Sequence, residues 1–255
     1  MLKLGFIGIG KIAIAAVKGL CTSGMENYII NLSPRNKLNA NRLVKAFSNV
    51  NKLESNQSVL DNSDFVFISL RIEDAIKELK DLKFRSTHNV ISFIPFLKYS
   101  KLVKAVNPAK KVSRAIPLPT VVNHNSPIPI FNTTKAITGI LSYLGKPLLV
   151  KDESQLHTLW ALTGFIAPFY DILNNLSDWA IQNSVKETIA NQYIVDMFYS
   201  LLYHNYQTKN INFSDLMKEA TTPNGLNYQA KKEINEKRVQ LVYKNTANNL
   251  LKRFD

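Results

Sequence analysis

The sequence contains little cysteine and no long apolar run. Cys21 is the only cysteine among 255 residues, so a disulfide framework within the chain is excluded. Cys21 ends a helical pattern, and we expect it to be packed rather than reactive. No apolar stretch reaches the roughly 20 residues that a membrane-spanning helix requires. The apolar start, Met1–Gly8, continues into Lys11 and Lys18 without a small-residue cleavage site, which argues against a secretory signal. We therefore expect a cytoplasmic protein with no membrane partner.

The spacings of metal centres and nucleic-acid modules are also missing. The four histidines are scattered, at His88, His124, His157 and His204, and none has metal-ligand spacing. No zinc-finger or RNA-binding aromatic motif is present. The basic segment Lys98–Lys111 is interleaved with apolar residues, as in an amphipathic helix. We therefore expect no metal site and no nucleic-acid partner.

Acidic residues are scarce in the first part of the chain. The net charge is +13, and residues 1–150 carry 21 basic and 8 acidic residues, whereas residues 151–255 carry 11 of each. A lysine-rich solvated surface explains such a surplus. An anionic ligand of the first half, such as nucleic acid or a phosphorylated cofactor, explains it equally well.

Short apolar runs alternate with helical patterns over the first 150 residues. Strands are expected at Leu4–Ile7, Tyr28–Leu32, Phe65–Leu70, Val90–Ile94, Val112–Ile116 and Leu148–Val150, and helices at Ile12–Leu20, Asn39–Phe47, Ala75–Leu79 and Thr133–Leu144. Apolar strands without polar alternation are typical of a parallel sheet that is buried on both faces. The pattern predicts an α/β domain, in which the proline-rich stretch 117–129 is an extended loop or an edge strand.

After Lys151 the pattern is helical only. Two pairs have capping-box spacing, Asp152 with Gln155 and Ser184 with Glu187. The helix after Ser184 is apolar around much of its circumference, which is common where two subunits share a helical core. We place the boundary near Val150–Lys151, with an α/β domain over 1–150 and a helical domain over 151–255.

A glycine-rich loop follows the first predicted strand directly. Residues 8–13 have the pattern G-x-G-x-x-A and open a helix, as the dinucleotide fingerprint requires. Gly8 permits a tight turn, and Gly10 lets the backbone approach a pyrophosphate at the helix N-terminus. The loop predicts a Rossmann dinucleotide-binding domain, with a glycine turn that binds no ligand as the alternative. Its candidate cofactor-binding residues are Gly8, Ile9, Gly10, Lys11 and Ile12.

The end of the second strand indicates which dinucleotide is bound. Sites that prefer NAD usually place an acidic residue there, but none occurs between Asn27 and Leu53. The strand is followed by Ser33 and Arg35 instead, and these suit a 2′-phosphate. Charge-assisted hydrogen bonds contribute about 1.5–3 kcal/mol each, so we predict NADPH as the cofactor. The alternative is that Arg35 is merely solvated.

With these residues in view, the chain resembles the Δ1-pyrroline-5-carboxylate reductase family over nearly its whole length. The segments that carry the resemblance are Gly8–Ala13, Ser33–Asn36, Asn56 with the strand Asp64–Ile68, Arg114–Pro117, and Thr222–Asn227. The resemblance implies NADPH-dependent hydride transfer to the C=N bond of a cyclic imine, pyrroline-5-carboxylate, giving proline. It implies that Asn56 contacts the cofactor. It also implies a homodimer formed through the helical domain, or a higher oligomer built from it, with the partner's helical domain completing the active site.

The loop Thr222–Asn227 resembles the segment that holds the substrate in that family. Its candidate substrate-binding residues are Thr222, Pro223, Asn224, Gly225 and Leu226. A loop that enters a helix N-terminus can bind a carboxylate through backbone N–H groups, and asparagine tolerates the positive φ that the family's glycine would adopt at Asn224. Asn227 replaces a threonine and is a candidate donor to the carboxylate. The alternative is an ordinary helix N-cap at Thr222.

Two further segments differ from the family's pattern. Ser69, Leu70 and Arg71 follow the third predicted strand, where such sheets bind ligands, and are candidate cofactor contacts; Arg71 is alternatively a solvated side chain. Thr163 precedes Gly164 at a helix break and is a candidate catalytic hydroxyl, unless it bonds its own helix backbone. The differences leave two rival functions open: reduction of another imine or a keto acid, and a non-catalytic NADP-binding role.

Overall fold

The computed structural model describes residues 1–209 and 211–254 and divides them into two units. The sheet unit comprises residues 1–160 together with Phe254, and the helical unit comprises residues 161–253. The division falls after Trp160, not near Val150–Lys151 as the sequence predicts. The difference arises because the first turns of α7 (Glu153–Leu162) are bonded to the sheet, as described below.

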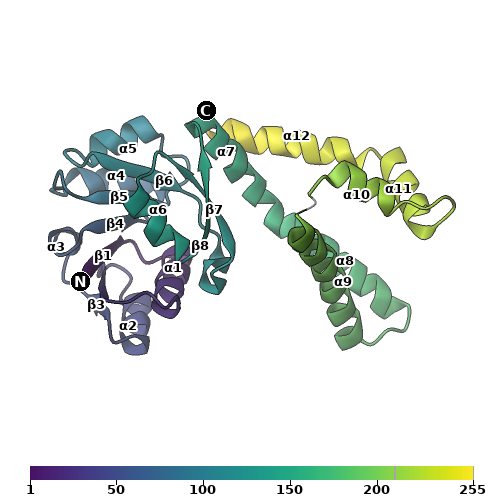
Figure 1. The fold of residues 1–255 in the computed structure, drawn as a ribbon, viewed down its shortest axis with the longest axis horizontal. Coiled ribbons are helices and arrows are strands. Elements are labelled where there is room, and N and C mark those ends of the chain that lie inside the picture. The colour runs from purple at the N-terminus through teal and green to yellow at the C-terminus, as the bar shows by residue number, and fades with distance from the viewer. Residues whose placement is uncertain (210, 255) are drawn as a thin grey trace. The chain divides into compact units, whose positions relative to one another are not determined.

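The strands described in the sheet unit form one eight-stranded sheet in the order β3-β2-β1-β4-β5-β6-β7-β8 (Figure 1). They are β1 (Leu2–Ile7), β2 (Tyr28–Leu32), β3 (Val50–Lys52), β4 (Phe65–Ile68), β5 (Asn89–Ser92), β6 (Lys111–Ala115), β7 (Ser126–Phe131) and β8 (Gly145–Val150). Neighbours run parallel except β6 and β7, which are antiparallel. The predicted α/β class is confirmed, and β3 is an additional short strand.

Helices cover both faces of this sheet. Those of the sheet unit are α1 (Lys11–Thr22), α2 (Lys37–Ala46), α3 (Asn56–Asp61), α4 (Ile72–Lys80), α5 (Tyr99–Ala105), α6 (Lys135–Ser142) and the 3₁₀ turn η1 (Pro119–Asn123). Successive strand residues point to opposite faces. Phe6 and Phe67 stack at 4.5 Å within the core shared with α1, α2 and α6, whereas Ile7 and Ile68 join the core of α3, α4 and α5. The core therefore consists of two layers separated by the sheet.

The proline-rich stretch is more ordered than expected. Pro119 begins η1, while Pro127 and Pro129 lie inside β7, which is paired on both sides and is not an edge strand. The Ile116 N–H donates to the Pro129 carbonyl at 3.0 Å. The nitrogen of a strand residue points the same way as its carbonyl, so the missing Pro129 donor faces β6. Because this missing donor faces β6, it costs no hydrogen bond to β8. On the β6 side, β7 is paired at only two residue pairs.

Cys21 lies in the last turn of α1, where it is half-buried. Burial raises the pKa of its thiol to about 11. Because the thiolate is the reactive form, this cysteine is unreactive near neutral pH.

A buried arginine ties the start of α7 to the sheet. Arg114, fully buried at the end of β6, donates to the Glu153 carboxylate, to His157 Nε2 at 2.8 Å, and to the Ile94 carbonyl at 3.3 Å. The Glu153 carboxylate also accepts from the Tyr99 backbone N–H at 2.6 Å. A buried charge is tolerated only when it is paired and hydrogen-bonded. Glu153 therefore fixes α7 to both β6 and α5.

Aromatic rings close over this arginine. The Trp160 ring lies 5.2 Å from the Arg114 guanidinium carbon, and Phe254 stacks on His157 with the ring centroids 4.7 Å apart. The ring centroids of Phe254 and Phe96 are also 4.8 Å apart. These contacts explain why Phe254 belongs to the sheet unit although the residues before it do not.

The helical unit contains only helices and turns in its described part, as the sequence predicts. Its elements are the 3₁₀ turn η2 (Thr163–Phe165), α8 (Ile166–Gln182), α9 (Glu187–Thr208), α10 (Phe213–Glu219), α11 (Leu226–Glu236), α12 (Val239–Leu251) and the 3₁₀ turn η3 (Lys252–Phe254). The predicted cap at Ser184 is wrong, because Ser184 adopts a φ of 70° and Lys186 precedes α9. Asp152 does cap α7, accepting from the Gln155 N–H at 2.8 Å.

The helical unit buries few apolar side chains. Ala161, Ala190 and Ile194 are its buried hydrophobic residues among those described. Most of the large apolar side chains of α8 and α9 are more than one-third exposed. Among the described residues, the structure contains no helix with both the length and the apolar character needed to span a bilayer.

Replacing Glu153 with glutamine tests the buried ion pair. Because the substitution leaves the fully buried Arg114 without a counter-charge, we expect Glu153→Gln to lower the free energy of unfolding by on the order of 3 kcal/mol. Asp215→Asn, which removes an exposed ion pair with Lys218, is the control and should cost less than about 1 kcal/mol. Urea denaturation measures both, and equal effects would contradict a structural role for Glu153.

Candidate functional site

A pocket of about 430 Å³ lies at the carboxyl ends of the central strands of the sheet unit. It is lined by Gly8, Ile9, Gly10, Arg35, Asn36, Lys37, Ser69, Leu70, Arg71 and Asp74. These residues follow β1, β2 and β4, where the strand order reverses direction about β1. Open α/β sheets bind their ligands at such a switch point. Seven of the predicted cofactor residues meet there: Gly8, Ile9, Gly10, Arg35, Ser69, Leu70 and Arg71.

Gly8 shapes the floor of the pocket. Its φ is +90°, and a Cβ at this position would lie 2.5 Å from the backbone oxygen of Ser69. Its N–H donates to the Ser33 hydroxyl at 3.0 Å. Ser33 is fully buried and does not line the pocket. Ser33 therefore holds the loop in this structure, and its predicted contact with a phosphate stays a prediction.

Gly10 leaves space for an anion. A Cβ at Gly10 would meet no atom within 4 Å, and Gly10 precedes α1 without a side-chain hydrogen bond to cap the helix. The first turn of α1 holds no acidic residue. Its unsatisfied N–H groups and partial positive charge suit a phosphate group. The loop residues therefore fit a dinucleotide pyrophosphate, with Lys11 and Ile12 contributing through the backbone of this first turn.

The segment after β2 supports the loop from the other side. The Asn36 side chain caps α2, accepting from the Asn39 N–H at 3.2 Å. The Asn39 side chain donates to the Ile9 carbonyl at 3.0 Å. Lys37 adds a cation to the pocket lining. The turn that carries Arg35 is thus bonded to the glycine loop.

Arg35 is engaged by two carboxylates that the sequence analysis did not identify. One guanidinium nitrogen donates to Asp74 at 2.9 Å, and the other donates to Glu78. Both acids belong to α4, one helical turn apart. The sequence signal is their i,i+4 spacing in the helix that follows Arg71. No local pattern relates these acids to the end of β2.

Asn56 belongs to the same network without lining the pocket. Its side-chain N–H donates to the second oxygen of Glu78 at 3.1 Å, while its side-chain oxygen is buried without a hydrogen-bond partner. Arg71, at the N-terminal end of α4, is exposed and lines the pocket. The predicted cofactor contact of Asn56 stays a prediction.

The predicted substrate loop lies in the helical unit and forms a turn into α11. The Gly225 N–H donates to the Thr222 carbonyl at 3.1 Å, and Asn224 takes a φ of 58°, as expected for this residue. Gly225 precedes α11 without a side-chain cap, so Thr222 is not the N-cap. Pro223 lies within this turn, and Leu226 begins the helix.

The two predicted catalytic residues are also in the helical unit. The Asn227 side-chain N–H donates to the Ala220 carbonyl at 3.0 Å, which ties the first turn of α11 to the end of α10. Thr163 begins η2, next to Gly164, where a Cβ would lie 2.6 Å from a Leu250 methyl. Their catalytic roles stay predictions. No cluster of three or more metal-ligating side chains occurs in the part of the chain described.

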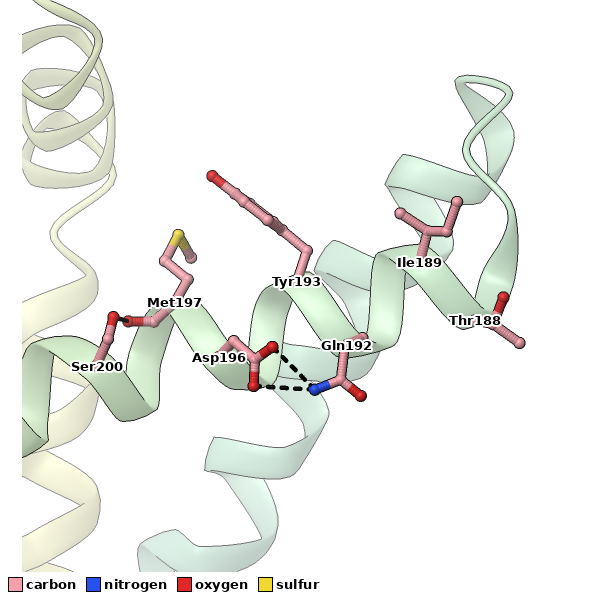
Figure 2. A pocket seen from close by; sticks show the side chains of 7 residues that line it. All are labelled: Thr188, Ile189, Gln192, Tyr193, Asp196, Met197 and Ser200. Carbon is pink, nitrogen blue, oxygen red and sulfur yellow. Dashed lines mark hydrogen bonds between the residues drawn. The ribbon is translucent and has the colours of Figure 1, made fainter.

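A broad groove of about 850 Å³ follows one face of α9 (Figure 2). Its lining residues are Thr188, Ile189, Gln192, Tyr193, Asp196, Met197 and Ser200. Gln192 donates to both oxygens of the Asp196 carboxylate at 2.9 Å. A single helix supplies all of these residues, so the groove is an open helix face and not an enclosed reaction site.

Comparison with known proteins shows which family model and which solved structures this chain resembles. Residues 3–95 match the family model described as NADP oxidoreductase, coenzyme F420-dependent. The structure of 1-pyrroline-5-carboxylate reductase from Streptococcus pyogenes superposes over 99% of this chain and 98% of its own, with a TM-score of 0.85 and 18% identity. The chain has the fold of the pyrroline-5-carboxylate reductases. The resemblance seen in the sequence is thus confirmed for the fold.

Other structures with this reductase fold were solved with the cofactor present. Pyrroline carboxylate reductase from Plasmodium falciparum, with NADP bound, matches over 99% of this chain and 97% of its own, with a TM-score of 0.85 and 16% identity. A reductive aminase from Aspergillus terreus, in complex with NADPH and ethyl-5-oxohexanoate, covers 86% of this chain and 77% of its own, with a TM-score of 0.59 and 16% identity. No curated protein matches the sequence significantly. The sheet unit is thus similar in fold to these proteins, and its residues 3–95 match a family of NADP oxidoreductases.

The two loop glycines provide a matched pair of substitutions. We expect Gly8→Ala to destabilise the unliganded protein by about 1–3 kcal/mol, because both the positive φ and the Ser69 oxygen oppose a side chain. Gly10→Ala has open space and should leave the melting temperature nearly unchanged, while its methyl group weakens NADPH binding at least about tenfold. Thermal unfolding and fluorescence titration measure the two effects. A stable Gly8→Ala variant with normal binding would contradict this account of the loop.

Proposed function

We propose that the protein is an NADPH-dependent reductase that converts pyrroline-5-carboxylate to proline. One observation carries the proposal: a chain with the reductase fold keeps both an anion-binding glycine loop in the sheet unit and the Thr222–Asn227 turn at the start of α11. A protein that only bound the dinucleotide would need the first of these features and not the second.

The sheet unit would hold the cofactor through backbone N–H groups and cationic side chains. The N–H groups that open α1 would bind the pyrophosphate, and Arg35 and Lys37, which line the same pocket, would bind the adenosine 2′-phosphate. Arg71, on the β4 side of the pocket, is a further cation for the phosphates. When bound, NADPH supplies the hydride for the C=N carbon. The protein's part is to position the cofactor and to hold the substrate.

The turn before α11 is the proposed carboxylate site. Gly225 leaves the helix start uncapped by any side chain, so the N–H groups of Leu226 and Asn227 are placed to donate to an anion. The Asn227 side chain, bonded to the Ala220 carbonyl, keeps this turn in position. The imine nitrogen can arrive protonated, so the reaction needs no pair of carboxylates. Thr163 is the proposed hydroxyl near the ring nitrogen.

We propose that the protein is a homodimer formed through the helical unit. Exposed apolar side chains follow α8 and α9, including Trp179 at 64%, Tyr193 at 66% and Leu202 at 58% exposure. So many exposed apolar side chains on two neighbouring helices favour a protein interface. A second copy offers the same surface and covers it symmetrically.

A second candidate is reduction of another imine or a keto acid with the same cofactor. It is favoured by the segment Leu118–Thr120, which lacks the asparagine found near the nicotinamide in the pyrroline-5-carboxylate reductase family and which enters η1. This change affects the substrate side of the site and leaves the glycine loop intact. A non-catalytic NADP-binding role is the third alternative.

The direct test is the initial rate of NADPH oxidation with pyrroline-5-carboxylate, with NADH as the control. We expect a kcat between about 1 and 1000 per second and a higher kcat/KM with NADPH. Tight NADPH binding without turnover would contradict the proposal. Other cyclic imines and keto acids would then separate the second candidate from the third.

The proposed dimer is tested by sedimentation velocity. We expect the unmodified chain to sediment as a dimer or a multiple of it. Leu201→Glu with Leu202→Glu places two charges on exposed apolar positions of α9 and should shift the protein to monomer, because the charges would be desolvated in the interface. The control, His204→Glu with Gln207→Glu, places them at exposed polar positions of the same helix. A monomeric unmodified chain at all concentrations would overturn the dimer.

A further inference from the structure

The proposed phosphate-binding pocket has two carboxylates beside it, which binding an anion does not require. Asp74 lines it, and Glu78 lies one turn further along α4. Both bind the guanidinium of Arg35, which is the cation placed for the 2′-phosphate. The Arg35 side chain is 56% exposed, whereas Asp74 and Glu78 are 39% and 23% exposed. The acids are therefore more buried than the arginine they bind.

We infer that Asp74 and Glu78 compete internally with the 2′-phosphate for Arg35, and so set how strongly the protein distinguishes NADPH from NADH. The inference rests on the proposed use of NADPH and assigns a specificity role to two residues of α4. The two carboxylates accept from two of the five N–H donors of the guanidinium, one on each terminal nitrogen. A 2′-phosphate must displace them or bind beside them.

Glu78 is fixed in this position by a third residue. One of its oxygens binds Arg35, and the other accepts from the Asn56 side chain at 3.1 Å. Asn56 follows Ser55, whose hydroxyl caps α3 by accepting from the Ser58 N–H at 3.0 Å. Glu78 is thus held through Asn56 by a capped helix, and it cannot turn away from Arg35 without losing a second hydrogen bond.

Asp74 lies near the N-terminal end of α4. It lies in the first turn of the helix, where partial positive charge favours a carboxylate. From there it faces the pocket as well as Arg35. An acid in this region can accept a hydrogen bond from the ribose 2′-hydroxyl of NADH, as the acidic residue after β2 does in NAD-preferring domains. Asp74 therefore favours NADH where Arg35 favours NADPH.

The balance of charge follows from this arrangement. Arg35 and Lys37 supply two positive charges from the β2 side, and Asp74 and Glu78 supply two negative charges from α4. A phosphate monoester carries about −1.5 to −2 charges near neutral pH. Arg71 lines the same pocket and adds a third positive charge, so the two acids leave a net charge of about +1 in place of +3. The preference for the 2′-phosphate is therefore weaker than the basic residues alone would give.

The test uses the full-length protein without substrate and measures binding by calorimetry. The probes are adenosine 2′,5′-bisphosphate, which carries the 2′-phosphate, and adenosine 5′-monophosphate, which lacks it. In Asp74→Asn with Glu78→Gln we expect the affinity for the bisphosphate to rise about tenfold at low salt, and the affinity for the monophosphate to stay the same or fall. The gain should shrink at high salt because exposed charges are screened. An unchanged or weaker affinity for the bisphosphate would overturn the inference.

Two further variants assign the effect to Arg35. Glu73→Gln with Asp81→Asn removes two exposed charges, one in the first turn of α4 and one at the residue that follows its last turn. This pair should change the bisphosphate affinity less than about twofold. Adding Arg35→Ala to the Asp74→Asn/Glu78→Gln variant should abolish the gain. An equal gain from the control pair would mean that α4 acts only through its general charge, which would also overturn the inference.

The proposed function and this inference fail in different ways. If the unmodified and the Asp74→Asn/Glu78→Gln proteins bind NADPH equally well, the inference is wrong and the proposed reductase is untouched. If both bind NADPH with the expected difference but neither turns over pyrroline-5-carboxylate, the proposed substrate is wrong and the inference holds. If neither binds NADPH, both are wrong.

Discussion

The hydrogen bond from the Gly8 N–H to the Ser33 hydroxyl joins the ends of two strands that are separated by a whole helix in the sequence. It fixes the glycine loop to β2. The Ser69 N–H donates to the Ile7 carbonyl at 2.8 Å and joins the end of β4 to the end of β1, where Gly8 lies too close to the Ser69 oxygen to carry a side chain. Three strand ends therefore meet around one residue that has no side chain. The pocket, the uncapped start of α1 and the position of Arg35 all depend on this junction.

The sequence predicted the parts of this arrangement that local patterns determine. The buried strands were identified because their apolar runs are continuous, and the glycine loop because its spacing is contained in six residues. β3 was missed because Val50 is its only buried residue. The strand β7 was expected to be a loop or an edge strand because proline lacks a backbone donor. Only the sheet shows that the missing Pro129 donor faces β6, with which β7 pairs at just two residue pairs.

The contacts that were not predicted are those between residues far apart in the chain. Asp74 and Glu78 lie 39 and 43 residues after Arg35, and no local pattern relates an arginine after one strand to acids on a helix two strands later. The domain boundary lies after Trp160 and not near Val150–Lys151 for the same reason, because Glu153 binds Arg114, which is 39 residues away in the sequence. Ser33 was identified as a site residue, but its burial behind the loop appears only once β1 and β2 are placed side by side.

The division of the chain also has a consequence for the order of events during synthesis. Every residue that lines the dinucleotide pocket lies within the first 74 positions, and the strands that position it belong to the first 160. Ribosomes extend chains at about 5–20 residues per second, and domains fold largely as they emerge. The sheet unit can therefore fold several seconds before the last helices have been made. A nascent chain can complete this pocket before the helical unit exists.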